Sequence, residues 1–284
     1  METVLIAGQG DLPVLVASKL KSTQIPFVVY SLKGFKNVSL NGYNPKILEF
    51  EKFGSFIKQL KSLGVKKICL AGIIKRPVFE VSLIDEDTLP LIPTLEKALK
   101  SGDDKALRLV ISLFESVGLE IIGAHEICPE LLVSEGLYSH VGLNSEDFED
   151  VKRAEEVLIQ TSSADMGQSC IISSGQVLCI ETIGGTDRMI ESLSLNRPSD
   201  NVYNDSFKYR RDPLIPLGGI LYKAAKNEQE IRVDMPVIGT RTFLLAKKVG
   251  LRGIVIKENS VMVLDKNRCI SMANSLGLFF LVVK

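Results

Sequence analysis

The first glycine-rich turn of the chain combines residue types that can bind an anion. Gly8 and Gly10 follow a short apolar run over residues 3–7, and Pro13 opens the helix expected after them. Glycines let a backbone approach a phosphate, and a helix N-terminus supplies N–H donors and a positive dipole. Asp11 can contact a hydroxyl group or cap the helix. The turn therefore predicts an anion or sugar-phosphate site, although a purely structural tight turn has the same pattern.

Two other turns follow predicted strands in the same half. Gly72 ends the apolar run 67–71, and Lys75 and Arg76 come shortly after it. Ligands bind outside the carboxyl ends of strands in open α/β sheets. These cations can therefore neutralise a phosphate, or they form only a solvated basic loop. His125 follows the last strand of this half, where it can be an acid, a base, a phosphate donor or a structural residue.

Two adjacent carboxylates stand at a predicted helix start. Asp103 and Asp104 follow Gly102 and open a helix expected to run to Val117. Such a pair can cap the helix and complement its dipole. It can also hold a hard cation through oxygen ligands. The pattern favours the cap, with the cation site as the alternative.

The second half places polar side chains near the ends of predicted strands. They are Asp165, Gln168, Thr186, Asp187 and Asp234. Mg²⁺ prefers one or two carboxylates with water and substrate phosphates, so metal-assisted phosphate chemistry needs such a supply. Separation along the chain does not show that these side chains converge.

Strand and helix signals alternate through the first half of the chain. Apolar runs of strand length alternate with helical patterns. The strands are expected at 3–7, 27–30, 46–49, 67–71 and 120–123. The helices are expected at 13–21, 53–63, 93–100 and 104–117. Such alternation predicts a parallel sheet with helices on its faces. The expected fold class is α/β, with an N-terminal Rossmann-like domain over residues 1–133.

The second half has a different pattern. Two strands joined by a Ser174-Gly175 hairpin signal follow an amphipathic helix over 147–161. Further strands are expected at 219–222, 231–233, 253–256, 261–264 and 278–282, with helices at 186–192, 240–249 and 266–276. Polar sequence over 134–145 predicts a linker. We therefore expect a C-terminal mixed α/β (α+β) catalytic domain over 146–284, with a long surface loop at 196–216.

Composition limits the class of partner. Among 284 residues, lysine plus arginine and aspartate plus glutamate each total 34, so the formal net charge is zero. A neutral chain gives no argument for nucleic acid or for a polybasic membrane anchor. No apolar run approaches the roughly 18 residues of a spanning helix, and the N-terminus lacks a signal peptide pattern. We expect a cytoplasmic protein whose five cysteines, without zinc-like spacing, are neither catalytic nor disulfide-bonded.

Eight short motifs stand in order along nearly the whole chain, at residues 5–13, 71–77, 102–104, 123–126, 165–168, 181–187, 232–236 and 277–279. Together they resemble the LpxI type of UDP-2,3-diacylglucosamine pyrophosphatase of Gram-negative lipid A biosynthesis. One such motif would be weak evidence, whereas eight in the family's order are specific.

The resemblance implies hydrolysis of UDP-2,3-diacylglucosamine to 2,3-diacylglucosamine 1-phosphate (lipid X) and UMP, by attack on the sugar-side phosphorus. It also implies a divalent cation, Mg²⁺ or Mn²⁺. Asp234 matches an aspartate that the family needs for catalysis, as a base or a metal ligand. Lys223, Lys226 and Arg232 match basic residues around it.

The remaining site assignments follow from the same motifs. We expect the turn and strand-end residues to bind substrate, namely Gly8, Gly10, Asp11, Gly72, Lys75, His125, Gln168, Thr186 and Asp187, and we keep Asp103, Asp104 and Asp165 as candidate metal ligands. A nucleotide-sugar lipid as substrate implies peripheral contact with the cytosolic face of the inner membrane. The resemblance also allows a homodimer.

Two other functions stay open. An oxidoreductase that binds a nucleotide sugar or a dinucleotide would use the first turn. However, Pro13 replaces the third glycine of the dinucleotide fingerprint, and Tyr30-Ser31-Leu32 offers no acid after the second strand. A non-catalytic ligand sensor would bind the substrate without releasing UMP and would not need Asp234.

Overall fold

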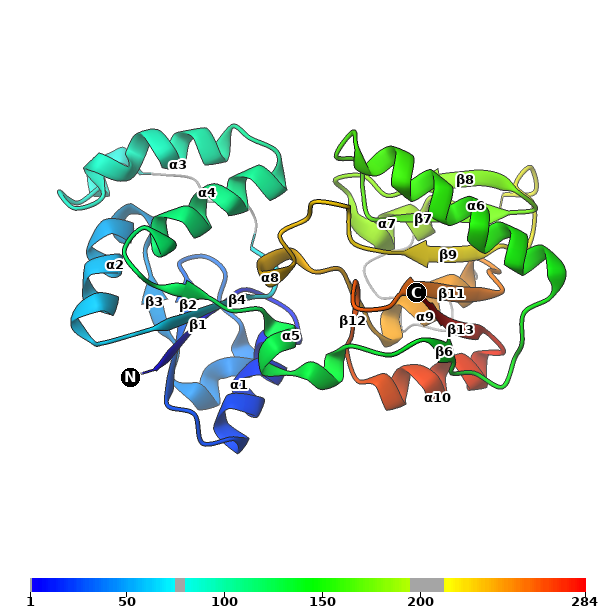
Figure 1. Ribbon diagram of the computed structural model, residues 1–284, viewed down its shortest axis with the longest axis horizontal. Helices are drawn as coiled ribbons and strands as arrows, with labels where there is room; N and C mark the ends of the chain where they lie inside the picture. The colour runs from blue at the N-terminus through cyan, green and yellow to red at the C-terminus, as the bar shows by residue number, and fades with distance from the viewer. Residues whose placement is uncertain (1, 75–79, 195–211) are drawn as a thin grey trace. The chain divides into compact units, whose positions relative to one another are not determined.

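The chain forms two compact units. The structure is a computed structural model that describes residues 2–74, 80–194 and 212–284 (Figure 1). The first unit contains Met1–Pro129 and Glu230–Asp234, and the second contains Glu130–Gln229 and Met235–Lys284. A five-residue segment from late in the sequence therefore belongs to the first unit.

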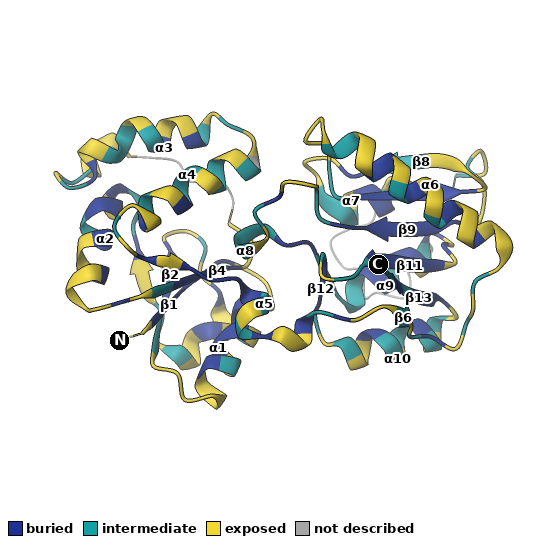
Figure 2. Cartoon of the chain, viewed as in Figure 1, coloured by how far each residue is buried: buried dark blue, intermediate teal, exposed yellow. Residues whose placement is uncertain are grey.

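A parallel five-stranded sheet forms the centre of the first unit. Its order is β3-β2-β1-β4-β5, with β1 at Thr3–Ala7, β2 at Phe27–Leu32, β3 at Lys46–Leu48, β4 at Lys67–Ala71 and β5 at Glu120–Ile121. All four strand pairings are parallel. This is the order of the first five strands of a Rossmann sheet, so the predicted α/β class of this domain is confirmed. Figure 2 shows the central strands as buried.

Helices cover both faces of this sheet. They are α1 (Leu12–Ser22), α2 (Phe53–Ser62), α3 (Ile92–Leu99), α4 (Asp103–Glu115), α5 (Ala124–Ile127) and α8 (Ile231–Asp234), with short 3-10 turns at Val38–Tyr43, Phe50–Lys52, Val81–Leu83 and Leu89–Leu91. On one face, α1 packs against β1, β2 and β4. On the other, Val4 and Ile6 of β1 join a core with Phe53 and Phe114 from α2 and α4. The alternation of strand side chains between two helical layers explains why β1 is buried throughout.

A mixed six-stranded sheet forms the second unit. Its order is β6-β13-β11-β9-β7-β8, with β6 at Gly136–Leu137, β7 at Ser169–Ser173, β8 at Gln176–Ile180, β9 at Ile220–Lys223, β11 at Gly253–Lys257 and β13 at Phe279–Val283. Strands β9, β11 and β13 run parallel, whereas β6, β7 and β8 join antiparallel neighbours. A separate parallel pair joins β10 (Val237–Ile238) to β12 (Met262–Val263).

The second sheet is also covered on both faces. Its helices are α6 (Ser145–Ser162), α7 (Gly185–Glu191), α9 (Thr240–Lys248) and α10 (Lys266–Leu276), with a 3-10 turn at Pro129–Leu131. Along β11, Ile254 and Ile256 belong to the core that contains α9 and α10 residues. Val255 between them belongs to the core that contains α6 residues. The mixed α/β class predicted for the second half is confirmed.

Several local predictions can be compared with these elements. The Ser174-Gly175 hairpin is confirmed, with Ser173 paired to Gln176. The predicted strand at 231–233 is wrong, because these residues begin α8. Residues 134–145, predicted as a linker, contain β6 of the second sheet. Most of the predicted loop 196–216 lies outside the described residues.

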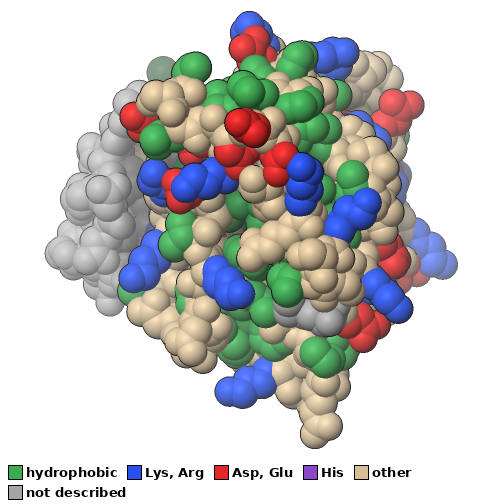
Figure 3. Space-filling view, turned by 90° about the vertical axis from the view of Figure 1, so that its left-hand side faces the viewer, with side chains coloured by type: hydrophobic (Ala, Val, Ile, Leu, Met, Phe, Trp, Pro, Cys, Tyr) green, Lys and Arg blue, Asp and Glu red, His purple; other side chains and the backbone are tan. Residues whose placement is uncertain are grey.

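The surface carries both signs of charge. On the face in Figure 3, lysine and arginine side chains are interspersed with acidic ones and with apolar side chains that reach the surface. In the described part of the chain, no helix combines the length and the apolarity needed to span a bilayer.

Candidate active site

The turn after β1 is fixed by hydrogen bonds to its neighbours. The Gly8 N–H donates to the Ala71 carbonyl at 2.8 Å, and Gln9 and Ile73 exchange two backbone hydrogen bonds at 2.9 Å. The Asn37 side-chain amide donates to the carbonyls of Gly8 (3.2 Å) and Gly10 (2.8 Å). Asn37 thus holds two carbonyls of the turn. Pro13 has no N–H, and the Val14 and Leu15 amides donate to the Asp11 carbonyl at 3.0 Å and 3.1 Å. An anion at the turn would therefore be bound by the amides that precede Pro13.

Close packing requires glycine at two positions of this turn. A Cβ on Gly8 would lie 2.5 Å from the Ile73 carbonyl oxygen. Gly72 has a φ of +93°, and its Cβ would lie 2.6 Å from Pro13 Cγ. The ends of β1 and β4 therefore approach so closely that packing alone accounts for these glycines. Asp11 is exposed and its side chain does not cap α1, so it remains a candidate for contact with a ligand.

His125 lies on α5, directly after β5. Its Nδ1 atom is buried and has no hydrogen-bond partner among the described residues. Burial lowers the pKa of the imidazole below its usual 6.5, and the nearby Glu126 carboxylate opposes that shift. A ring held neutral at pH 7 can donate one hydrogen bond to a phosphate oxygen.

Asp234 ends the segment Glu230–Asp234, which belongs to the first unit although the residues before and after that segment belong to the second. It ends α8, which packs against β4 and α5. Val233 beside it packs on the apolar core of the first unit. The Asp234 side chain is partly buried. The structure thus brings Asp234 to the carboxyl edge of the parallel sheet, the same edge that carries the Gly8 turn, Gly72 and His125.

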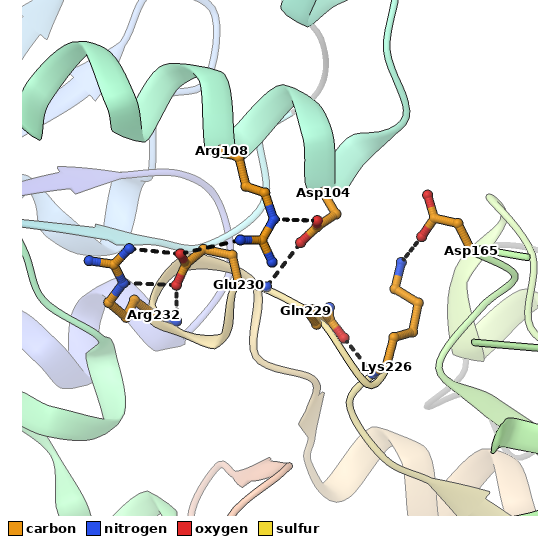
Figure 4. Close-up of polar contacts among 7 residues, drawn as sticks. All are labelled: Asp104, Arg108, Asp165, Lys226, Gln229, Glu230 and Arg232. Atoms are coloured by element: carbon orange, nitrogen blue, oxygen red, sulfur yellow. Dashed lines mark hydrogen bonds and ion pairs between the residues drawn. The ribbon is translucent and has the colours of Figure 1, made fainter. Parts of the chain in front are cut away.

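Charged residues of α4 and α8 form a connected network (Figure 4). Arg232 binds both carboxylate oxygens of Glu230, at 2.8 Å and 2.7 Å, and reaches Glu115 at 2.8 Å. Asp104 accepts a hydrogen bond from the Glu230 N–H at 2.9 Å and one from Arg108 at 2.7 Å. Sequence patterns do not predict this network, in which Arg232 contacts carboxylates.

A buried polar cluster lies in the second unit, at the end where β7 begins and β8 and β9 end. Lys223 and Glu181 are only 4% and 6% exposed, and the Lys223 Nζ lies 3.9 Å from a Glu181 oxygen. Thr186 accepts a hydrogen bond from Lys223 at 2.6 Å and donates one to Glu181 at 2.9 Å. Ser169 also donates to Glu181. The predicted site residues Lys223 and Thr186 therefore meet, around a carboxylate that was not among the predicted site residues.

The other polar candidates of the second unit have partners too. Lys226 pairs with Asp165 at 2.6 Å (Figure 4). Asp187 pairs with Arg241 at 2.5 Å, and the Gln168 side chain accepts a hydrogen bond from Gln229 at 3.1 Å. Lys75 lies outside the described residues.

The candidate metal ligands whose side chains are described, Asp104 and Asp165, do not form a preformed cage. Among the described side chains, no group of three or more histidine, cysteine or acidic residues is placed to hold an ion. Asp104 and Asp165 each pair with a cation, they belong to different units, and the Asp103 side chain is not among those described. All five cysteines are free thiols, and four are buried.

Comparison with known proteins identifies the family. The model of the LpxI N-terminal domain matches residues 2–131, and that of the LpxI C-terminal domain matches residues 134–281. The chain belongs to the LpxI family. A family member from Caulobacter vibrioides, named UDP-2,3-diacylglucosamine pyrophosphatase LpxI, is 36% identical over 279 residues, which cover 98% of this chain and 96% of that protein. The resemblance stated from the motifs is confirmed.

Proposed function

We propose that this chain hydrolyses the pyrophosphate bond of UDP-2,3-diacylglucosamine to give UMP and 2,3-diacylglucosamine 1-phosphate, in lipid A biosynthesis. The observation that carries the proposal is the match to the relative of that name, which spans 98% of this chain and so includes both units. The edge of the parallel sheet supports it, since a glycine turn, a histidine and an aspartate lie along that edge.

The charge of the substrate defines what the site has to do. A diphosphate repels an incoming water oxygen, so positive charge and N–H donors must neutralise it before attack. The turn at Gly8 and Gly10 supplies the backbone amides that precede Pro13, and His125 donates from its neutral ring. These groups hold the diphosphate, and they also stabilise the charge that develops as UMP leaves.

Asp234 accepts a proton from the attacking water. The water oxygen bonds to the sugar-side phosphorus, the bond from that phosphorus to the bridging oxygen breaks, and UMP leaves with that oxygen. Asp234 is suited to this role because it is a partly buried carboxylate at the end of α8. A carboxylate within reach of the water is the geometric requirement for a general base.

Mg²⁺ or Mn²⁺ is the cofactor we propose, and it would neutralise diphosphate charge when bound. The described carboxylates do not form a cage for it. Mg²⁺ commonly takes most of its ligands from water and substrate phosphates, so it would enter with the diphosphate. Isothermal titration should then detect tight Mg²⁺ binding only when UDP-2,3-diacylglucosamine or UDP is present. Tight binding of Mg²⁺ to the protein alone would contradict this assignment.

The two acyl chains of the substrate connect the reaction to a membrane surface. Burial of a lipid chain contributes about 0.8 kcal/mol per CH₂, so an apolar groove would hold the enzyme near the cytosolic face of the inner membrane. Peripheral membrane contact and a homodimer are further proposals. Flotation with vesicles that contain the substrate, and light scattering, test them separately.

Hydrolysis in ¹⁸O-labelled water tests the proposed reaction. The expected products are unlabelled UMP and a sugar 1-phosphate that carries one ¹⁸O, as seen by mass spectrometry. Label in UMP would place the attack on the uridine-side phosphorus instead. Binding of the substrate without any UMP would favour the ligand sensor, and a bound nicotinamide or flavin in the purified protein would favour the oxidoreductase.

A further inference from the structure

The α8 helix is too short to be stable by itself. It has four residues, and the backbone N–H groups of Val233 and Asp234 donate to the Glu230 carbonyl at 3.2 Å and 3.0 Å. A first helical turn fixes several residues for few hydrogen bonds, so its formation is unfavourable in isolation. Contacts with the rest of the first unit must therefore hold α8 in place.

Those contacts come from both ends of α4. At its start, Asp104 accepts the Glu230 N–H at 2.9 Å. At its end, Glu115 pairs with Arg232 at 2.8 Å. Between them, Arg108 pairs with Asp104 at 2.7 Å and lies 4.0 Å from Glu230. The segment 230–232 is thus fixed at its backbone and at both of its charged side chains.

The geometry of these pairs favours a fixed position. Arg232 and Glu230 form a bidentate ion pair, which is stronger and more directional than an ion pair with a single hydrogen bond. The Glu230 side chain is 12% exposed, so water screens the pair less than it would a surface pair. Hydrogen bonding by Arg232 lowers the pKa of Glu230, so the carboxylate stays ionised at neutral pH.

We infer that five charged residues fix the position of the α8 turn and so orient the Asp234 carboxylate. These positioning residues are Asp104, Arg108, Glu115, Glu230 and Arg232. The inference rests on the proposed function, and in particular on Asp234 as the group that acts on water. It gives Asp104 a role other than metal ligation. It also gives Arg232 a role other than direct contact with the substrate.

Kinetics of Glu230→Ala against a matched control tests the inference. Misplacement of a reacting group by about 1 Å can reduce turnover by about a hundredfold, so we expect kcat to fall at least about tenfold with KM changed less than about twofold. The control is Glu49→Ala, which removes a carboxylate of the first unit that pairs with Lys52 and Lys33. We expect it to match wild type in kcat, KM and melting temperature.

Two variants of Asp104 separate positioning from metal ligation. Asp104→Asn keeps an oxygen that can accept the Glu230 N–H, so it should retain kcat within about threefold and keep the wild-type Mg²⁺ concentration for half-maximal rate. Asp104→Ala should lose kcat as Glu230→Ala does. These variants also decide the question if Glu230→Ala fails to fold.

The possible outcomes are distinct. If wild type releases no UMP, the proposed function fails. If wild type is active and Asp234→Ala is not, yet Glu230→Ala and Asp104→Ala turn over like wild type, only the positioning inference is overturned. A rise of tenfold or more in the Mg²⁺ requirement of Asp104→Asn would also overturn it, in favour of metal ligation.

Discussion

Replacement of Glu181 by alanine should strongly destabilise the second unit. Glu181 is 6% exposed, and it faces Lys223, which is 4% exposed, at 3.9 Å. It also accepts hydrogen bonds from Thr186 and Ser169. The substitution takes a carboxylate away from a buried ammonium group and takes the acceptor from two hydroxyl groups. The Lys223 ammonium group and the Thr186 and Ser169 hydroxyl groups then stay buried without the carboxylate that compensates for their loss of water.

The size of the effect follows from that burial. Removal of one partner of a buried ion pair costs about 3–5 kcal/mol. For a unit of about 150–250 residues, each kcal/mol lowers the melting temperature by about 2–4 °C, so we expect a fall of roughly 6–20 °C. Scanning calorimetry measures this fall, and amide exchange along β7 and β9 locates it in the second unit.

A double variant provides the matched comparison. Glu181→Gln with Lys223→Met removes both charges while keeping similar side-chain volumes, and neutral replacement of a buried pair is often close to neutral in stability. We expect it to melt within about 5 °C of wild type. A Glu181→Ala variant that loses less than about 1 kcal/mol, or a double variant less stable than Glu181→Ala, would refute the role given to this pair.

Three further predictions concern packing, pH and thiol reactivity. Gly8→Ala should lower the free energy of unfolding in urea by about 1–3 kcal/mol, because its Cβ would meet the Ile73 carbonyl at 2.5 Å. The control Gly42→Ala, which has open space around its Cβ, should change this free energy little. Equal stability of the two variants would contradict the packing. Because the pKa of Glu230 is lowered below 4.5 in the folded state, its contribution to stability is complete above pH 4.5 and lost as the pH falls through the folded pKa. Wild type and Glu230→Gln should therefore differ in unfolding free energy at about pH 6, and this difference should shrink as the pH is lowered below 4.5 and through the folded-state pKa. A difference that stays constant as the pH is lowered would be inconsistent with this. Burial raises the pKa of Cys170 and Cys269 to about 12, so a thiol reagent at about pH 8 should label them only after unfolding, and rapid labelling of the native protein would contradict it.

Local sequence patterns predict much of the sheet framework. In the first sheet, β1, β3 and β4 are short apolar runs that are each followed by a turn and a helical pattern, and these signals are carried by neighbouring residues. The turn after β1 was predicted as an anion site, and its glycines do lie at the carboxyl edge of the parallel sheet. Its hydrogen bonds to Asn37 were not predicted, because Asn37 lies 27 residues from Gly10.

The α8 segment shows why the rest could not be predicted. Ile231-Arg232-Val233 alternates apolar and charged residues, which is a strand pattern. It is helical because Glu230 and Arg232 contact α4 residues 126 and 117 positions away in the sequence. The assignment of Asp234 to the first unit has the same cause. No local signal reports contacts of this range, so tertiary structure overrides the local pattern.

The buried Lys223 is a second case. A charged residue at a strand end is usually solvated, and here it is buried because Glu181, which follows β8, and Thr186 of α7 reach it. Its place in the fold depends on partners that lie 37 and more residues away in the sequence. Only the resemblance to a family singled it out before the structure did.

Turnover of UDP-2,3-diacylglucosamine by wild type and Asp234→Asn tests the central claim most directly. Asparagine keeps the shape of the aspartate, and α8 is held by Glu230 and Arg232, so the variant should fold and bind the substrate. We predict Mg²⁺-dependent UMP release by wild type and a loss of at least about a hundredfold in kcat for the variant, as expected when a general base is removed. UMP release by the variant at the wild-type rate would contradict the account.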